Sequence, residues 1–475
     1  MTTPTLVQAL GAFAAGSTID TIPPEVTASV PQRVLDIIGI CVCATTLDTS
    51  SAVLDLAAAD GGNPVATAIG LPVCLPPGAA AFANGVLAHS LDYDDTHLPS
   101  ILHPSASVVP AALAAAESSG ADGRALVGAV AAGLEIAVRL GMAGFDPAAN
   151  GGAGQSVYFE HGQHATSMCG AIGSAAAAAI LLGGGAGDAA HAMAVAASMA
   201  SGIIEANRTG GTVKRIHCGL AAQAGVAAAR LVRAGLTGPP TALEGRFGFF
   251  EAFLRDEWRR GPVLDGLGDE WSVAGIFYKP YPANHFTHAG IDAALRLRAA
   301  GLRATDVDSA HLGVATPTVR TIGEPLDVKQ SPATGYQAQF SGPYTVATAL
   351  LGGSGLGFGL DDVTDDMARD PERRALAARI TVGGDPACDA IYPAQFPAVL
   401  TVHTIDGRTL VEEVLVNRGG PGDPLSDTEL ERKFSDNTAG LLSPADASEV
   451  MGTAARLAAL GSVAELMAPL RRVRR

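Results

Sequence analysis

Alanine-rich apolar segments, broken by glycine and proline, run through roughly the first half of this chain and constrain its fold more than any other feature. The segments are Arg33–Thr46, Pro77–Asp92, Ala106–Ser118, Gly123–Leu140, Thr166–Leu182, Asp188–Ser201 and Leu220–Ala234. Alanine is the best helix former, so each segment predicts a helix. Glycine supplies 57 of the 475 residues and aromatic residues only 5%, so the core must consist of small side chains in closely packed helices.

The overall charge narrows the class of protein. Hydrophobic residues make up 48% of the chain and charged residues 16%, which excludes a disordered chain. The net charge of −16 argues against a nucleic-acid partner, because phosphate binding needs a basic face. The six cysteines lack metal-site spacing, and the first residues lack a basic region, so we expect a cytoplasmic enzyme. Residues 164–187 contain no Asp, Glu, Lys or Arg. Most of them have small side chains, which favours a buried helix over a membrane span.

The sequence texture changes near residue 268. Residues 272–282 and 307–319 are expected as strands, and 398–416 as a hairpin that turns at Asp406-Gly407. Helices are expected at about 287–299, 343–352 and 366–378, and again at Asp427–Phe434 and Ser443–Leu460. The pattern predicts a mainly α fold: an all-helical body formed by both chain ends, with a smaller inserted α+β lid domain. The expected domains are 1–267, 268–418 and 419–475.

A cluster of polar residues follows the segment that ends at Asp92. The sequence AHSLDYDDTHLPSILHPS holds His89, Asp92, Asp94, Asp95, Thr96, His97 and His103. If the helix continues, His89 shares a face with Asp92, and Asp92 shares one with Thr96. Three readings stay open: a solvated helix end, a divalent metal site without a recognised ligand frame, and a functional cluster.

Two further segments place imidazoles or cations just before helices of small residues. A glycine-rich loop over residues 141–162 leads into His161 and His164, and Lys214, Arg215 and His217 precede the next helix. Helix N-termini attract anions through free N–H groups. A histidine there suits proton transfer or simple capping, and the basic triplet suits either a site or a surface turn.

Lysine is scarce, and its four positions are Lys214, Lys279, Lys329 and Lys433. Where arginine usually replaces lysine, a retained lysine is a candidate for chemistry that needs a deprotonatable amine. Lys279 lies in FYKPYPANHFTHAG with His285 and His288, and Tyr344 follows Ser341 at the start of another apolar helix. The chain has no phosphate-binding loop, nucleophile elbow or dinucleotide fingerprint, which leaves a cofactor-free proton-transfer site for an acidic substrate.

These segments together resemble the MmgE/PrpD family, which includes 2-methylcitrate dehydratases, cis-aconitate decarboxylases and iminodisuccinate epimerase. The matching pieces, in order, are AHSLDYDDTH with HPS, HATSMCGAIGSAAAAA, VKRIHCGLAAQAGVAAARLVRAGLTGP, LEGRFGFF, YKPYPANHFTHAGIDAAL, QFSGPYTVA and GDPLSDTELERKF. The resemblance implies a helical domain made by both chain ends, a smaller α+β lid, a homodimer, and an active site between the domains that needs no metal or organic cofactor.

The resemblance also implies the site residues. Expected catalytic residues are Asp92, His103, His164, Lys214 and Lys279. Expected substrate-binding residues are Thr96, His97, Arg215, His217, His285 and Tyr344. The expected reaction is dehydration or decarboxylation of a small di- or tricarboxylate through proton transfer beside a carboxylate. Two alternatives remain: an epimerase or isomerase of a small dicarboxylate, and a homologue without catalytic activity.

Overall fold

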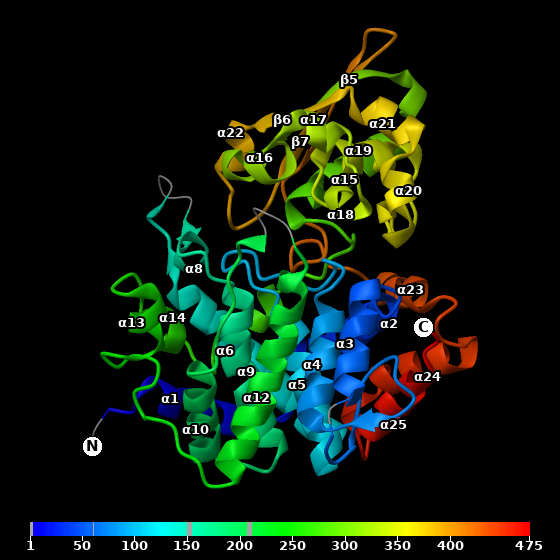
Figure 1. Cartoon of the computed structure of the whole chain (residues 1–475). Coiled ribbons are helices and arrows are strands. Elements are labelled where there is room, and N and C mark those ends of the chain that lie inside the picture. The colour runs from blue at the N-terminus through cyan, green and yellow to red at the C-terminus, as the bar shows by residue number, and fades with distance from the viewer. Residues whose placement is uncertain (1–2, 60, 150–153, 207–210) are drawn as a thin grey trace. The chain divides into compact units, whose positions relative to one another are not determined.

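The computed structural model describes residues 3–59, 61–149, 154–206 and 211–475. The chain forms two compact units (Figure 1). The helical unit comprises Met1–Pro147, Gln155–Ile276 and Phe434–Arg475. The α+β unit comprises Phe277–Lys433 with the described residues of the short segment 148–154.

Closely packed helices build the helical unit, as the alanine-rich pattern predicts. They are α1 (Leu6–Gly16), α2 (Pro24–Ala44), α3 (Asp48–Ala59), α4 (Pro77–Ala88), α5 (Ser105–Ser119), α6 (Gly123–Ala143), α8 (Val157–Glu160), α9 (Ala165–Leu181), α10 (Ala186–Ala197), α12 (His217–Arg233), α13 (Phe249–Leu254), α14 (Gly261–Leu264), α24 (Pro444–Ala455) and α25 (Ala464–Met467). Two short ribbons join them: β1 (Ala66–Thr67) with β2 (Cys74–Leu75), and β3 (Phe145–Asp146) with β4 (Gln155–Ser156). Among the described residues of this unit, these ribbons are the only strands, and loops join the helices.

Helix α9 lies at the centre of this unit and contacts α5, α6, α10 and α12 (Figure 1). Its sequence is ATSMCGAIGSAAAAAIL, and nearly every residue is buried. Small side chains let the neighbouring backbones approach closely: a Cβ added to Gly173 would lie 2.4 Å from the Gly133 carbonyl oxygen on α6. Helices α2 and α6 are long and apolar enough to cross a membrane, a test that buried helices also pass, and most of each is buried here.

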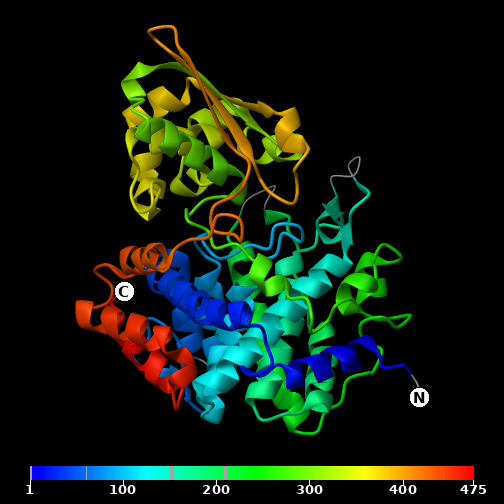
Figure 2. The same ribbon diagram turned by 180° about the vertical axis from the view of Figure 1, so that it is seen from behind.

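The C-terminal helices pack on the N-terminal part of the same unit, as Figure 2 shows from behind. Helix α24 contacts α2, the Gly123 N–H donates to the Leu460 carbonyl at 3.0 Å, and the Val463 N–H donates to the Ala121 carbonyl at 3.2 Å. The prediction of a helical body formed by both chain ends is confirmed.

A four-stranded sheet with the order β6-β5-β7-β8 organises the α+β unit. The strands are β5 (Val307–Val314), β6 (Ile380–Gly384), β7 (Ala398–Thr404) and β8 (Thr409–Val414); β5 and β6 are parallel and the other pairs antiparallel. The helices are α15 (His288–Ala299), α16 (Thr316–Ile322), α17 (Leu326–Gln330), α18 (Gly335–Ala338), α19 (Gly342–Leu351), α20 (Asp365–Ala368), α21 (Pro371–Ala377), α22 (Pro386–Asp389) and α23 (Asp427–Thr438), of which the last runs on into the helical unit. Helices α15 and α19 pack with the sheet around one apolar core.

The hairpin prediction is confirmed, since β7 and β8 pair from His403↔Thr409 outward. Three other predictions need correction. The expected strand at 307–319 ends at Val314, and Thr316–Ile322 forms α16. Residues 272–282 form a 3₁₀ turn, Ser272–Gly275, and an irregular segment instead of a strand. The expected helix at 366–378 divides at Asp370, whose side chain caps α21.

The long loop at 141–162 contains more structure than predicted. Helix α6 extends into it to Ala143, the ribbon β3–β4 follows, and α8 completes it, while residues 150–153 lie outside the described part of the chain.

The units divide after Ile276 and after Lys433. The domain boundaries expected from the sequence were 267/268 and 418/419. Hydrogen bonds give the physical reason. The Arg33 guanidinium donates to the carbonyls of Val273 and Ile276, each at 3.0 Å, which ties residues 268–276 to the helical unit. The Lys433 ammonium donates to the Lys279 carbonyl at 2.9 Å, which ties α23 to the α+β unit.

Candidate active site

A buried loop between α4 and α5 supplies most of the candidate site. Helix α4 ends at Ala88 with His89 as its C-cap, so Asp92 and Thr96 lie in the loop and the predicted shared helix face is wrong. Asp92 has a φ of +52° and is buried. Positive φ is uncommon outside glycine, although aspartate tolerates it better than most residues, and such backbone gathers at functional sites.

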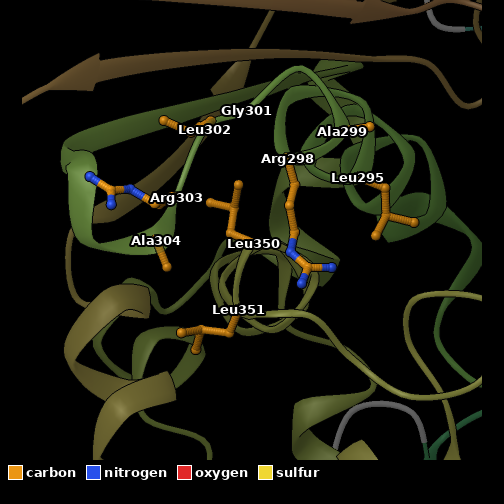
Figure 3. A pocket seen from close by; sticks show the side chains of 9 residues that line it. All are labelled: Leu295, Arg298, Ala299, Gly301, Leu302, Arg303, Ala304, Leu350 and Leu351. Atoms are coloured by element: carbon orange, nitrogen blue, oxygen red, sulfur yellow. The ribbon is translucent and has the colours of Figure 1, made fainter.

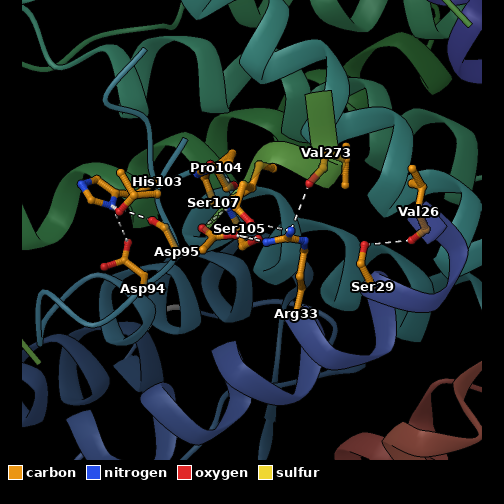
Figure 4. Close-up of polar contacts among 12 residues, drawn as sticks. Val26, Ser29, Arg33, Asp94, Asp95, His103, Pro104, Ser105, Ser107 and Val273 are labelled. Carbon is orange, nitrogen blue, oxygen red and sulfur yellow. Dashed lines mark hydrogen bonds and ion pairs between the residues drawn. The ribbon is translucent and has the colours of Figure 1, made fainter. Parts of the chain in front are cut away.

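An ion pair inside the protein fixes this loop. The Arg33 guanidinium lies 3.0 Å from the Asp95 carboxylate, with both side chains 2% exposed (Figure 4). The Ser105 hydroxyl donates to the same carboxylate at 2.5 Å, and the Ser105 N–H donates to it at 3.2 Å. Burial raises the pKa of Asp95 to about 6, although Arg33 and Ser105 both act to lower it. Asp95 therefore anchors the loop to α2 and to the start of α5.

Beside this anchor, the loop brings two imidazoles to a second carboxylate. His89 Nδ1 lies 2.7 Å from Asp94 Oδ2, and His103 Nδ1 lies 4.0 Å from the same oxygen. His103 Nδ1 also lies 2.7 Å from the Asp95 carbonyl and 3.3 Å from the Thr96 hydroxyl. Figure 4 shows His103 facing both Asp94 and Asp95.

Two more imidazoles come from the starts of α9 and α12, the pair of helices in the centre of the unit. His164 is the N-cap residue of α9 and His217 begins α12. Their Nδ1 atoms are 3.0 Å apart, so one of them donates to the other. The His164 N–H donates to the Gly202 carbonyl at 3.0 Å, and a side chain on Gly202 would press on His164 and Ser167. The 200–204 segment can support His164 this closely because residue 202 is glycine.

The four imidazoles form one cluster. Ring centroids are 5.4 Å apart for His89 and His103, 5.5 Å for His89 and His164, and 5.0 Å for His164 and His217. All four residues are at most 8% exposed.

Burial favours the neutral form of two of the four imidazoles, His164 and His217. It lowers the pKa of His164 well below the usual value, and the positive charges of His89, Lys214, His217 and His103 lower it further. Burial likewise lowers the pKa of His217 to about 4, with His89 and Lys214 adding to the effect. A neutral imidazole has a lone pair and can accept a proton, as a general base must.

The other predicted site residues of the helical unit are Lys214, Arg215 and His97. Lys214 is in the 3₁₀ turn Val213–Ile216, and its charge acts on His164 and His217. Arg215 donates to the Thr49 hydroxyl at 2.8 Å, at the start of α3. His97 Nδ1 lies 2.7 Å from the Ser100 hydroxyl, which holds the turn between the bridged residues His97 and Leu102.

In the α+β unit, Lys279 and His285 lie in the proline-bounded segment before α15. Lys279 is 1% exposed, and its carbonyl accepts the hydrogen bond from Lys433. His285 stacks on His288 with centroids 4.5 Å apart, and Phe277 and Phe396 face its edges. The Tyr281 hydroxyl donates to Asp292 at 2.5 Å and accepts from Arg418 at 3.0 Å, which fixes the segment between the two histidines and Lys279.

Tyr344 and the open groove of this unit lie apart from Lys279 and His285. Tyr344 is fully buried in the core, where its hydroxyl donates to the Asp362 carbonyl at 2.6 Å. A groove of about 490 Å³ lies at the C-terminal end of α15, around Arg298, Leu302 and Leu351 (Figure 3). His288 begins the same helix, roughly 15 Å away at 1.5 Å per residue, and none of the predicted site residues lines the groove.

In the part of the chain that the structure describes, no three or more His, Cys, Asp or Glu side chains are arranged so that they could hold a metal ion. The cluster is instead a set of imidazoles and carboxylates that bond one another.

Four residues of this arrangement are not among the site residues predicted from the sequence: Arg33, His89, Asp94 and Asp95. The last three lie in the polar segment it singled out, and the density of charge in an otherwise apolar stretch was the available signal. Arg33 lies 62 positions before its partner Asp95. A single sequence offers no signal for that pairing beyond an arginine at the start of an apolar helical run.

Comparison with known proteins places this arrangement in context. Residues 8–260 match the MmgE/PrpD N-terminal domain, and residues 281–457 match the MmgE/PrpD C-terminal domain. Cis-aconitate decarboxylase of Homo sapiens is 29% identical over 87% of this chain and 83% of its own length. The enzyme of that name from Mus musculus is 29% identical over 86% and 82%, and the one from Aspergillus terreus 26% identical over 73% and 71%.

Proposed function

This chain belongs to the MmgE/PrpD family, and on that premise we propose that it is a lyase that decarboxylates a tricarboxylate of the cis-aconitate type. The observation that carries the proposal is the 29% identity to human cis-aconitate decarboxylase along 87% of the chain. The dehydratase and epimerase reactions of the family have no comparable support among these relatives.

The chemistry of decarboxylation fits the residues gathered in the helical unit. The bond between a carbon and its carboxylate breaks, CO2 leaves, and the electron pair on the carbon framework takes up one proton. A site for this reaction must hold the remaining carboxylates and must deliver that proton. Groups that stabilise the developing negative charge better than the ground state lower the barrier.

We assign the roles by charge and position. The starts of α9 and α12, with the cation Lys214 beside them, favour bound carboxylates. His103 and His164 are the candidates for moving the proton, and Asp92 and Thr96 for orienting groups in the loop. Lys279 is the second lysine candidate, on the strength of the family resemblance alone.

The decisive experiment incubates the purified protein with cis-aconitate in D2O and follows the mixture by NMR. Decarboxylation releases CO2 and places one deuterium in each product molecule. Citrate-, methylcitrate- and succinate-type acids serve as comparisons. Release of water instead of CO2 from any acid would make the protein a dehydratase, and exchange without loss of a fragment would make it an isomerase or epimerase.

Substitution of the proposed proton-transfer residue His164 and of the cation Lys279 tests the assignment. We expect His164→Ala and Lys279→Ala each to lower kcat/KM for the identified substrate by at least about 100-fold, the usual contribution of such groups. The control is His403→Ala, since His403 is exposed on the β7–β8 hairpin and contacts Thr409. Turnover within a few-fold of wild type in both site variants would show that these side chains are not in the machinery.

The proposal includes catalysis without a metal or organic cofactor, as the family resemblance implies. Dialysis against a strong chelator, followed by gel filtration, is then expected to leave kcat within about twofold of the untreated protein. Loss of turnover that Mg²⁺ or Zn²⁺ restores would contradict this part of the proposal and leave the decarboxylation itself standing.

A further inference from the structure

The His89–Asp94 pair has no place in the roles assigned above, yet it lies inside the imidazole cluster. The two side chains are 1% and 0% exposed, and His89 Nδ1 is 2.7 Å from Asp94 Oδ2. A carboxylate can only accept a hydrogen bond, so Nδ1 of His89 carries the hydrogen and Nε2 carries the lone pair. That Nε2 atom is buried and has no hydrogen-bond partner among the described residues.

The neighbours of His89 are the two imidazoles assigned to proton transfer. Its ring centroid lies 5.4 Å from that of His103 and 5.5 Å from that of His164. Asp94 Oδ2 is also 4.0 Å from His103 Nδ1. One buried carboxylate therefore acts on His89 directly and on His103 at slightly longer range.

Charged and titratable groups face this pair from every side. They are Arg33 and Cys41 on α2, Asp95 and His103 in the loop, His164 at the start of α9, Lys214 in its 3₁₀ turn, and His217 and Cys218 on α12. Asp95 is already paired with Arg33 and accepts a hydrogen bond from Ser105. Asp94, which contacts His89 and lies 4.0 Å from His103, is the carboxylate placed to balance a positive charge on these two imidazoles.

We propose that His89 and Asp94 are positioning residues that hold a proton for the imidazole cluster, in service of the lyase reaction proposed above. The His89 Nε2 lone pair takes up a proton that His103 or His164 would otherwise carry, and the resulting imidazolium is balanced by the Asp94 carboxylate. No bond to substrate forms or breaks at the pair. Its effect is to set the protonation state in which His103 and His164 meet the substrate.

A purely structural role is the competing explanation, because His89 also caps α4 and the pair braces the loop. Two substitutions separate the explanations. Asp94→Asn removes the charge and keeps the shape. His89→Asn keeps an N–H that can reach Asp94 and removes the group that can take up a proton.

The first measurement needs no substrate. The full-length protein, labelled with ¹⁵N-histidine, is titrated by NMR from pH 9 down to the lowest pH at which it stays folded. We expect Asp94→Asn to remove the downfield Nδ1–H signal of His89 and to lower the fraction of protonated imidazole in the cluster at a given pH, because an opposite charge within 4–6 Å favours the protonated form. His403→Asn is the matched control and is expected to leave these signals unchanged.

The second measurement is the pH profile of kcat/KM with cis-aconitate. Both variants are expected to lower kcat by roughly 10-fold or more, with KM within about threefold, and Asp94→Asn to move the limb governed by the imidazoles to lower pH.

The outcomes distinguish this proposal from the proposed function. Identical histidine titrations in wild type and Asp94→Asn would overturn the pair's role whether or not cis-aconitate is turned over. A wild-type protein inactive on every acid would overturn the lyase proposal, while the titration would still test the pair. If Asp94→Asn does not fold, a His89→Asn variant with wild-type kcat and pH profile would also refute the role.

Discussion

His97 lies in the buried turn that His97 and Leu102 close, with its Nδ1 2.7 Å from the Ser100 hydroxyl. Burial lowers the pKa of His97 to about 4. In the unfolded chain a histidine has a pKa of about 6.5, so between these values the unfolded state binds the proton and the folded state does not. The stability that depends on neutral His97 is complete above about pH 6.5 and is lost as pH falls toward 4.

We therefore expect His97→Gln to flatten the acid dependence of stability. At 1.36 kcal/mol per pKa unit, the wild-type contribution across this window is at most about 3 kcal/mol, and glutamine retains a hydrogen bond to Ser100 without titrating. Urea unfolding at several pH values between 4.5 and 7 measures it, with the fluorescence of Trp258 and Trp271 reporting on the helical unit. An equally steep loss of stability in wild type and variant would mean that His97 does not titrate on unfolding.

Residue types and their spacing pointed to the polar loop and to the histidines before α9 and α12, and the structure brings His103, His164 and His217 together. The sequence did not predict the residues that contact these histidines. His89 pairs with Asp94 because α4 stops at Ala88 and the chain turns back. Where a helix stops in an alanine-rich run depends on packing around it, which local sequence does not contain.

Helices in this protein pack through glycine, and the packing makes opposite predictions for two glycines on neighbouring helices. A Cβ on Gly173 of α9 would lie 2.4 Å from the Gly133 carbonyl oxygen and 3.0 Å from the Ala137 Cβ on α6. A Cβ on Gly187 of α10 would meet nothing within 4 Å. The first position cannot take a methyl group unless α6 and α9 move apart.

Gly173→Ala is expected to destabilise the helical unit by about 1–3 kcal/mol, the usual cost of overpacking a core. Gly187→Ala, the matched control, is expected to stabilise it by about 0.5–1 kcal/mol, because alanine is the better helix former and has room. The midpoints of urea unfolding of the two variants, compared with wild type, show whether each substitution lowers or raises stability. Equal shifts in the two variants would show that intrinsic helix propensity, rather than the α6–α9 contact, decides the effect.

Elements with a strong period or a turn signal were predictable, and elements fixed by distant partners were not. The alternation around Asp406-Gly407 located the hairpin, and alanine content located α9. Residues 272–282 looked like a strand because they are apolar and aromatic. Pro280 and Pro282 lack the N–H that a central strand needs, and Arg33 takes the Val273 and Ile276 carbonyls instead. Strand β6 was missed, since its run Ile380–Gly384 is short and ends in two glycines.

The molecule closes its helical unit with the last residues of the chain. Leu457, Leu466, Met467 and Leu470 are all fully buried. Burial of such side chains contributes about 1.5–3 kcal/mol each, or roughly 6–12 kcal/mol for the four as an upper estimate. Whole domains are stable by only about 5–15 kcal/mol, so these four contacts are comparable to the entire stability of the unit.

Removal of residues 456–475 is therefore expected to prevent the helical unit from folding, because the surfaces of α6, α24 and β1 that the segment covers would face water. The truncated chain should give little soluble protein and no cooperative thermal transition by circular dichroism. Leu470→Ala is a milder variant, with an expected loss of stability of about 2–5 kcal/mol.

Removal of Arg475 alone is the control. Arg475 is exposed and pairs with Asp55 at 3.3 Å, so its removal should change the midpoint of thermal unfolding by no more than about a degree. A truncated chain that unfolds cooperatively within a few degrees of wild type would show that the N-terminal helices form a stable core without the C-terminal segment.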